Sequence, residues 1–497
     1  MSLYSSFLAS RHVTTDSRTV RPGSIFFALK GENTDGNLFA KQALDNGAAL
    51  CVVDNPDCLF NDRCLLVPDA LKALQDLARE HRLHLNIPVI GITGTNGKTT
   101  TKELVNAVLS RRFRVSATQG NFNNHIGVPL TILSIPEDAE IAIVEMGANH
   151  PGEIDFLCNI ANPDFGLITN VGKAHLEGFG SFKGVIRTKT ELYKHLAAMA
   201  GVIFVNADND ILMERAEKLA ILPSSPSVLP GVIPSFPGAT PADYSGDFRP
   251  RGVNMPMASV VTYGSSMTAE YKGSFVSADP YMKFYFEDDD NVYTVQSHLI
   301  GGYNFDNAMA AVCVGRYFGV ELFDIKTAIE EYMPSNNRSQ FKQTERNSLI
   351  LDCYNANPSS MKVAIENFLS MKADHKVAIL GAMRELGPSS LSEHRALLSL
   401  LQNANQQITN NQQIPPLDQI ILIGPEFSFA DKSPVCRVAN ATPAPSAPSA
   451  TPAAPALSYF PSTDAALDYL KRSPISNATI LIKGSNSNRL WLLQSAL

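Results

Sequence analysis

The sequence predicts an α/β protein divided into three domains. A chain of 497 residues is too long for one hydrophobic core, and its length suggests about three domains. Short apolar runs alternate with helical patterns along most of the chain, which is typical of parallel sheets covered by helices. Hydrophobic residues make up 44% of the chain, which is enough for a folded protein rather than a disordered one.

Residues 1–84 are predicted to form a small α/β domain. The apolar runs Ser24–Leu29 and Ala48–Asp54 predict two strands, because both are short and rich in β-branched and aromatic residues. The segment between them has helical periodicity and ends at Gly47, a residue type that commonly terminates helices.

Residues 85–333 are predicted to form a central domain with a mostly parallel sheet. Helical patterns separate its apolar runs, so crossover helices would join neighbouring parallel strands. The predicted strands are Ile87–Thr93, Glu140–Gly147, Phe165–Gly172 and Gly201–Asp208.

Residues 334–497 repeat this alternation and predict a third, Rossmann-like α/β domain. Such sheets bind ligands beyond the carboxyl ends of their strands, and clefts between domains offer further sites. The predicted strands are Ser348–Tyr354, Lys376–Met383, Gln419–Gly424 and Ala478–Ser485.

Two segments interrupt the α/β pattern. Leu222–Gly246 and Ala441–Ser458 are rich in Pro, Ser and Ala. Proline lacks a backbone donor and fixes φ, so neither segment should form regular structure. We expect both to be exposed insertions, the first in the central domain and the second in the last.

Composition narrows the class of protein. The net charge is −7 and the basic residues are dispersed, which argues against nucleic acid as the partner. The longest apolar runs are shorter than the roughly 18 residues of a membrane span, and the first residues lack the apolar segment of a signal peptide. Seven cysteines without paired metal spacing favour free buried thiols. We therefore expect a cytoplasmic protein with no membrane span.

The stretch from Gly91 to Thr99 predicts a nucleotide phosphate loop. It reads Gly-x-x-Gly-x-x-Gly-Lys-Thr and joins a predicted strand to a predicted helix. Glycines let backbone N–H groups approach phosphate oxygens, and the helix N-terminus adds the positive end of its dipole. Lys98 can reach the outer phosphates and the Thr99 hydroxyl can bind magnesium. The loop alone does not separate an ATPase, a switch GTPase, a kinase and a ligase.

The phosphate loop resembles that of the Mur ligase family, the amide-forming enzymes of peptidoglycan assembly. Other motifs of the family follow in order along nearly the whole chain. They are Thr15–Gly36, Gly120–Pro129, Glu145–Ile154, Asn170–Ser181, Lys189–Leu192, Asn206–Asp210, Gly301–Ala311, Asp352–Met361, Gly381–Gly387 and Ile482–Ser485.

Within the family, three motifs are most similar to those of ligases that add D-alanyl-D-alanine to UDP-N-acetylmuramoyl-tripeptide. They are "FFALKGENTDG", "GNFNNHIGVP" and "YNANPSSM". The resemblance implies a domain that binds the UDP end of the substrate, a central ATPase domain and a final ligase domain. Alternatives are another Mur-type amino acid ligase, a folylpolyglutamate-synthetase-like ligase and a non-catalytic nucleotide-binding protein.

The resemblance also implies a mechanism with ATP and magnesium. A peptide carboxylate would be phosphorylated by ATP, and the dipeptide amine would then attack the acyl phosphate. Thr99 and Glu145 match the family's first magnesium position, and His175 and Lys189 match the second. There the lysine carries a carbamate made with carbon dioxide. By the same resemblance, Lys98, His175 and Lys189 are the catalytic residues.

Further residues are assigned to ligands by the same resemblance. The predicted ATP-binding residues are Gly94, Thr95, Asn96, Gly97, Lys98, Thr99, Thr100, Asn304, Asn307, Arg338 and Asp352. The predicted substrate-binding residues are Ser17, Arg18, Asn121, Asn123, Asn124 and Lys483. The chain departs from the family at Tyr303, where a histidine is common. We expect a monomer whose partners are its small-molecule substrates.

Overall fold

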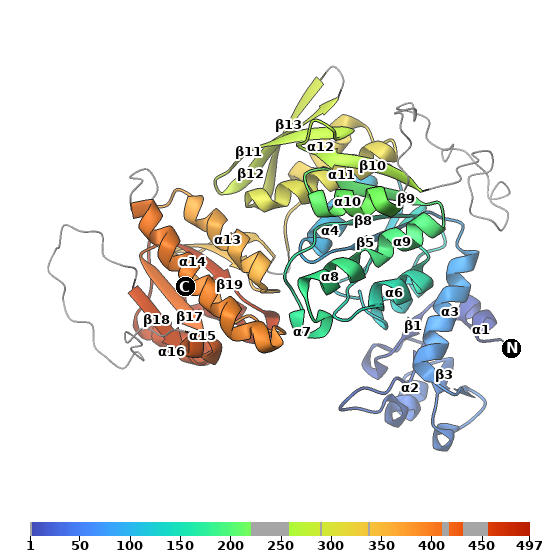
Figure 1. Ribbon diagram of the computed structural model, residues 1–497. Helices are drawn as coiled ribbons and strands as arrows, with labels where there is room; N and C mark the ends of the chain where they lie inside the picture. Colours follow the sequence, from blue (N-terminus) through green and yellow to red (C-terminus); the bar gives the residue numbers. More distant parts are fainter. Residues whose placement is uncertain (1, 220–257, 289–290, 336–337, 410–416, 431–455) are drawn as a thin grey trace.

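The computed structural model describes residues 2–219, 258–288, 291–335, 338–409, 417–430 and 456–497. Within them, the strands form three sheets that follow one another along the chain (Figure 1). The sheets have four, nine and six strands. The predicted α/β class is therefore confirmed. The stretch 222–246 lies outside the described residues.

The first sheet is small and parallel. Its strands lie in the order β1-β2-β3-β4, and each pairs in parallel with its neighbour. Helix α2 ends at Asp45, two residues before the predicted end at Gly47. The elements are α1 Leu3–Ser10, β1 Val13–Thr14, β2 Ile25–Phe27, α2 Ala40–Asp45, β3 Leu50–Val53, β4 Cys64–Leu66 and α3 Ala70–His84.

The central sheet has the order β13-β12-β11-β10-β9-β8-β5-β7-β6. The four predicted strands, β5, β7, β8 and β9, pair in parallel as expected. The sequence analysis missed β6, β10 and β11, which add further parallel pairs, and β12 and β13, which extend the sheet from β11 with antiparallel pairs. Its strands are β5 Val89–Thr93, β6 Val115–Ala117, β7 Ile141–Glu145, β8 Phe165–Ile168, β9 Val202–Asn206, β10 Ser259–Gly264, β11 Tyr271–Ala278, β12 Tyr281–Asp288 and β13 Asn291–Ile300.

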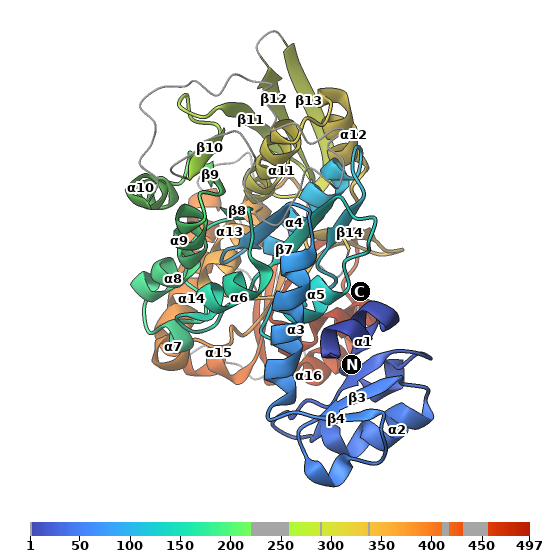
Figure 2. The ribbon, with the colours of Figure 1, turned by 90° about the vertical axis from the view of Figure 1, so that its right-hand side faces the viewer.

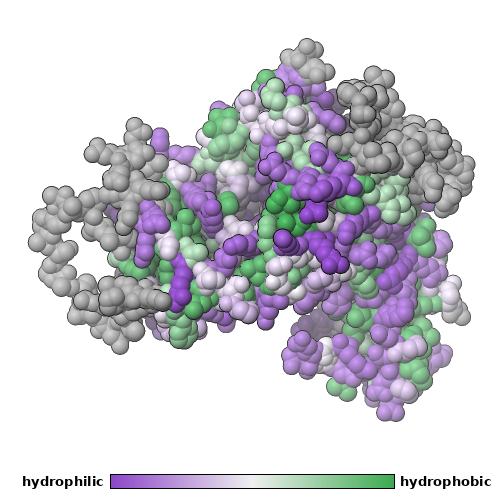
Figure 3. Space-filling view, in the orientation of Figure 1, coloured by the Kyte–Doolittle hydropathy of each residue, from purple (hydrophilic) through white to green (hydrophobic). Residues whose placement is uncertain are grey.

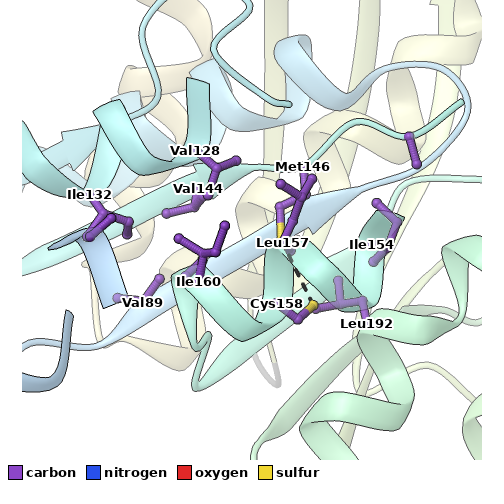
Figure 4. Packing of buried hydrophobic residues seen from close by; sticks show 14 of the residues in the cluster. Val89, Val128, Ile132, Val144, Met146, Ile154, Leu157, Cys158, Ile160 and Leu192 are labelled. Carbon is purple, nitrogen blue, oxygen red and sulfur yellow. Dashed lines mark hydrogen bonds between the residues drawn. The ribbon is translucent and has the colours of Figure 1, made fainter. Parts of the chain in front are cut away.

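Helices cover both faces of the central sheet. Successive side chains of a strand point to opposite faces, so Val89 packs with α5, α6 and α9 while Ile90 packs with α4, α11 and α12. Figure 4 shows the first of these clusters, with Val144 and Met146 between α5 and α6. The helices are α4 Lys98–Leu109, α5 Gly127–Leu133, α6 Glu153–Ala161, α7 Leu176–Phe179, α8 Phe182–Lys189, α9 Glu191–Ala198, α10 Asp210–Leu219, α11 Phe305–Tyr317 and α12 Leu322–Glu331.

The third sheet has the order β14-β15-β19-β16-β17-β18, with β14 antiparallel and the other strands parallel. Strand β18 includes residues 456–458, which corrects the expectation that 441–458 is irregular throughout; the cause is backbone pairing with β17. The elements are β14 Gln340–Gln343, β15 Ser348–Asp352, α13 Pro358–Ser370, β16 Lys376–Gly381, α14 Ser390–Thr409, β17 Gln419–Ile423, α15 Pro425–Ala430, β18 Ala456–Phe460, α16 Thr463–Arg472 and β19 Thr479–Lys483.

Helix α3 joins the first sheet to the central one. It packs against α1 on one side and against α5 and α6 on the other, as Figure 2 shows from a second direction. Among the described residues, no helix combines the length and apolar character needed to cross a membrane.

Arg82 ties the end of α3 to the central sheet. Its guanidinium donates to the carbonyls of Ala161 and Asn162, each at 2.9 Å, and to the carboxylate of Asp164 at 2.8 Å. The same carboxylate accepts from the backbone N–H of Val89 at 2.9 Å, at the start of β5. This buried ion pair therefore sets where the central sheet begins relative to α3.

Replacing Arg82 with leucine should lower the free energy of unfolding by about 3–5 kcal/mol, because it leaves the Asp164 carboxylate desolvated without its cation. Urea denaturation measures the loss. The matched control is Lys72→Ala on the same helix, which removes an exposed ion pair with Asp76 and should cost less than about 1 kcal/mol. Equal losses in the two variants would contradict the role given to Arg82.

Candidate active site

A cavity of about 790 Å³ opens between the central and third sheets. Its walls include residues at or just after the carboxyl ends of β5, β7, β8, β15 and β19, where α/β sheets bind ligands. Fifteen predicted site residues lie on its walls: Thr95, Asn96, Gly97, Lys98, Thr99, Thr100, Asn123, Asn124, Glu145, His175, Asn304, Asn307, Arg338, Asp352 and Lys483.

Five predicted site residues do not line this cavity: Gly94, Ser17, Arg18, Asn121 and Lys189. Ser17 and Arg18 belong to the first sheet's part of the chain. There the Ser17 hydroxyl donates to Gln42, and the Arg18 guanidinium contacts Asp16 through both carboxylate oxygens. Gly94 belongs to the phosphate loop and is buried.

The phosphate loop connects β5 to α4 and needs glycine at two positions. Gly94 has φ +145° and Gly97 has φ +77°, values that side chains disfavour. A Cβ at Gly94 would lie 2.0 Å from the Thr169 hydroxyl oxygen, and one at Gly97 would lie 2.5 Å from Asn307 Oδ1. The loop is thus packed between Thr169, which follows β8, and Asn307 of α11, so side chains at Gly94 and Gly97 would have no room.

The side chain of Lys98 folds back over the loop. Its ammonium donates to the carbonyls of Gly94 at 2.8 Å and Thr95 at 3.1 Å. Burial lowers the pKa of Lys98, and the positive charge of Arg338 acts in the same direction, whereas Glu145 opposes it. The Lys98 ammonium is partly buried and donates to carbonyls rather than to a carboxylate, so it is suited to bind a phosphate.

Thr99 and Glu145, the predicted first metal pair, are in direct contact. The Thr99 hydroxyl donates to Glu145 Oε2 at 2.9 Å, and the Asn123 amide donates to Oε1 at 2.8 Å. Glu145 ends β7 and is only 1% exposed. The carboxylate is therefore held in one orientation, and Asn123, predicted to bind substrate, contacts this carboxylate.

His175 and Lys189 lie in different surroundings. His175 lines the cavity, and its backbone lies in the left-handed region with φ +49°. Its side chain forms an ion pair with Glu385, which belongs to the part of the chain that contains the third sheet. Lys189 is 2% exposed, and its amine contacts the carbonyl of Ala148 at 3.3 Å. Within the described residues, no carboxylate forms an ion pair with it. Burial, reinforced by the charge of Lys98, lowers the pKa of Lys189 well below its ordinary value.

The predicted ATP-binding asparagines hold α11 against the phosphate loop. Asn307 Nδ2 donates to Asn304 Oδ1 at 2.9 Å, and the Thr101 hydroxyl of α4 donates to Asn307 Oδ1 at 3.0 Å. Asn304 in turn donates to the carbonyl of Ile300 at 2.8 Å. Tyr303, where the family commonly has histidine, donates or accepts a 2.8 Å hydrogen bond with Ser339.

The third sheet contributes three charged groups to the cavity wall. Asp352 and Lys483 end the paired strands β15 and β19 in the same register, so their side chains meet at 2.5 Å. The Arg338 guanidinium stacks on the Tyr354 ring, 3.5 Å from its centroid. An ion pair thus joins two residues with different predicted roles: Asp352 is predicted to bind the ribose of ATP, and Lys483 is predicted to bind the substrate.

Direct contacts join the central and third parts of the chain at the cavity. The Asn357 amide donates to Asn96 Oδ1 of the phosphate loop at 2.8 Å. Lys173 donates its backbone N–H to the Ser359 hydroxyl at 2.8 Å and pairs with Glu393 at 2.9 Å. The sequence analysis missed these contacts. The Asn-Pro-Ser-Ser stretch signals a helix start, but nothing in it signals a partner 261 residues away.

Comparison with known proteins gives relatives over most of the chain. The ligase named UDP-N-acetylmuramoyl-tripeptide–D-alanyl-D-alanine ligase from Bacillus subtilis is 35% identical, and the match covers 77% of this chain and 76% of that protein. The ligase of that name from Escherichia coli is 32% identical over the same shares.

Solved structures share the fold. The crystal structure of MurF from Acinetobacter baumannii has a TM-score of 0.75 and 28% identity, covering 97% of this chain and 92% of that one. MurF ligase from Thermotoga maritima in complex with ADP has a TM-score of 0.74 and 25% identity, covering 100% and 98%. Folylpolyglutamate synthase from Mycobacterium tuberculosis has a TM-score of 0.55 and 13% identity, and the match covers 86% of this chain and 94% of that one. At this identity the likeness shows a shared fold and nothing more.

Three family models together match most of the chain. The Mur ligase family catalytic domain matches residues 10–82, the Mur ligase middle domain matches 92–223, and the Mur ligase glutamate ligase domain matches 337–486. These ranges follow the three sheets in order. The chain belongs to the Mur ligase family.

Proposed function

We propose that this protein uses ATP to join D-alanyl-D-alanine to UDP-N-acetylmuramoyl-tripeptide, which gives the UDP-MurNAc-pentapeptide precursor of peptidoglycan. The observation that carries the proposal is the shared cavity, where the phosphate loop lies on one wall and Asp352 and Lys483 lie on another. The names of the relatives, which match most of the chain, support the choice of substrates.

The reaction needs an activated carboxylate, because a carboxylate repels nucleophiles and has no good leaving group. An oxygen of the tripeptide carboxylate attacks the γ-phosphorus, the bond to the bridging oxygen breaks, and ADP leaves. The dipeptide amine then attacks the acyl carbon, and phosphate leaves with the electrons of the C–O bond while the amine loses a proton. Splitting the ligation into these steps lowers each barrier. Lys98 balances the charge of the phosphates.

The residues at the phosphate loop fit a magnesium ion. Magnesium prefers oxygen ligands, and the Thr99 hydroxyl and the Glu145 carboxylate already lie in contact at the loop. A bound magnesium ion would neutralise phosphate charge and orient the γ-phosphoryl group. Asn123 keeps the carboxylate in place through its 2.8 Å hydrogen bond. We assign Thr99 and Glu145 to this ion.

Lys189 fits the carbamate proposed for the second magnesium position. Carbamate formation requires a neutral amine, which attacks carbon dioxide, forms an N–C bond and loses a proton. Desolvation favours the neutral amine, and burial lowers the pKa of Lys189. The modified side chain would offer two oxygen ligands where the lysine itself offers none, and His175 is the other residue that we assign to this position.

The first domain is proposed to hold the UDP end of the substrate through Ser17 and Arg18, with Asn121, Asn123 and Asn124 along the sugar and peptide. We place the domain limits at 1–84, 85–333 and 334–497. We also propose that the enzyme is a monomer and that it acts in the cytoplasm.

Other functions receive less support. A folylpolyglutamate ligase shares the fold, but its 13% identity carries no argument about substrates. A non-catalytic nucleotide-binding protein would need neither the buried Lys189 nor the Glu145 carboxylate. Another Mur-type ligase would share the central site and differ in its amino acid substrate, so only an assay separates it from the proposed enzyme.

Phosphate release from ATP should require both UDP-N-acetylmuramoyl-tripeptide and D-alanyl-D-alanine, because the acyl phosphate forms only when the carboxylate is present and is discharged by the dipeptide amine. Colorimetric phosphate detection with one substrate omitted at a time measures this, with Lys98→Ala as the inactive control. Release that ignores the dipeptide, or that occurs only with folate and glutamate, would refute the proposed function.

Replacing Lys189 with alanine should lower kcat at least about a hundredfold, because the second position loses charge stabilisation worth several kcal/mol. Short-chain carboxylic acids should restore part of the activity by supplying the missing oxygens. Lys471→Ala, an exposed lysine on α16, is the matched control and should keep full activity. Full activity in the Lys189 variant would remove this residue from the mechanism.

Replacing Asn357 with serine should lower kcat/KM by roughly threefold to tenfold, the equivalent of one lost hydrogen bond between the third domain and the phosphate loop. Serine retains the helix cap, because its hydroxyl can accept from the Ser360 N–H as Asn357 now does at 2.9 Å. The melting temperature should therefore stay nearly unchanged. A lower melting temperature with unaltered kcat/KM would show that Asn357 serves only the helix.

A further inference from the structure

A second, smaller cavity of about 270 Å³ lies between α8, α9 and α10, away from the active site. Five basic side chains line it: Lys183, Arg187, Lys194, Arg215 and Lys218. Figure 3 shows hydrophilic residues gathered over α8 and α10 on this side of the molecule. We call this feature the basic groove.

The basic side chains come from both sides of the groove. Lys183 and Arg187 are four residues apart on α8, and Thr190 and Lys194 continue the same helical stripe at intervals of three and four. Arg215 and Lys218 are three residues apart on α10, across the groove. Like charges at such spacing repel one another, so the arrangement costs stability when the groove is empty.

Few acceptors balance this charge. Of these five cations, only Lys218 forms an ion pair within the part of the chain that the structure describes, and its partner is Glu214 of the preceding turn. Arg215 Nε is buried and has no hydrogen-bond partner in the part of the chain that the structure describes. A guanidinium nitrogen can only donate, and most buried donors in proteins have an acceptor, so this Nε is available to donate to an anionic ligand in the groove.

The size and charge of the groove define the ligand. Pockets for drug-sized molecules hold roughly 300–1,000 Å³, so a groove near the bottom of this range suits a compact ligand. Lys218 is already paired, so four cations of the groove remain to be balanced. Each phosphate group carries a charge of about −1.5 to −2 at neutral pH, so two phosphate groups balance these four cations. Guanidinium groups bind phosphate oxygens through two parallel hydrogen bonds.

We propose that the basic groove binds a compact anion with a diphosphate group at a site separate from the ATP loop. Thr190, on the groove wall, directly follows Lys189, so a bound anion would hold the end of α8 that carries this residue. The inference rests on the groove and is independent of the proposed ligase activity.

Isothermal titration with inorganic pyrophosphate in magnesium-free buffer tests the proposal. The Lys98→Ala variant should still bind one pyrophosphate, whereas Arg187→Gln/Arg215→Gln in that background should lose at least tenfold in affinity. The control Lys471→Gln/Arg472→Gln removes the same charge from α16 and should bind normally. Added salt should weaken binding, because the groove is open to solvent.

Three results would overturn the proposal. Binding that disappears in Lys98→Ala would place pyrophosphate at the ATP loop. Equal binding by the groove variant and the α16 control would exclude the groove. The third result would be a wild-type protein that binds anionic lipid vesicles but not pyrophosphate, together with a groove variant that no longer binds the vesicles. This result would identify the groove as a membrane contact. Melting curves of each variant without ligand report whether the fold is intact. Removing two of the like charges reduces the repulsion between them, so the groove variant should be at least as stable as the wild type.

Discussion

The hydrogen bond between Thr99 and Glu145 is the contact on which the active site depends. It forms because β5 and β7 pair in parallel with Ile92 opposite Glu145, so both strands end at the same edge of the sheet. The glycines of the phosphate loop then turn the chain directly into α4, which presents Thr99 at that edge. A shift in the register of β7 by one residue would turn the carboxylate to the other face of the sheet.

Desolvation gives the buried lysines of this site their chemistry. Among the described residues, the Lys98 ammonium donates to two backbone carbonyls, and the Lys189 amine contacts one carbonyl and lies 5.4 Å from the centroid of the Phe179 ring. Burying a cation without a paired carboxylate is unfavourable, and this desolvation lowers the pKa of both lysines. The cost is offset at Lys98 when phosphate binds and at Lys189 when the amine is neutral or carries a carbamate.

The active site also depends on contacts between parts of the chain that fold around different sheets. Asn357 reaches Asn96, Lys173 reaches Ser359 and Glu393, and His175 pairs with Glu385. The Asn357–Asn96 hydrogen bond is partly buried, whereas the ion pairs Lys173–Glu393 and His175–Glu385 are partly exposed. Each is a single polar contact, so each contributes little energy by itself. An interface of this kind suits domains that must open to admit substrates and close for the reaction.

The sequence by itself determined the α/β class and the phosphate loop, and the family resemblance of its motifs identified fifteen residues of the cavity wall. These depend on local patterns: apolar runs predict strands, and the glycines with Lys98 and Thr99 predict a phosphate site. Only the tertiary structure decided which side chains meet, such as Asp352 with Lys483 and Asn123 with Glu145. It also decided that Arg215 lacks an acceptor among the described residues. These relations join residues far apart in the chain, and no local pattern encodes them because strand order and packing set the distances.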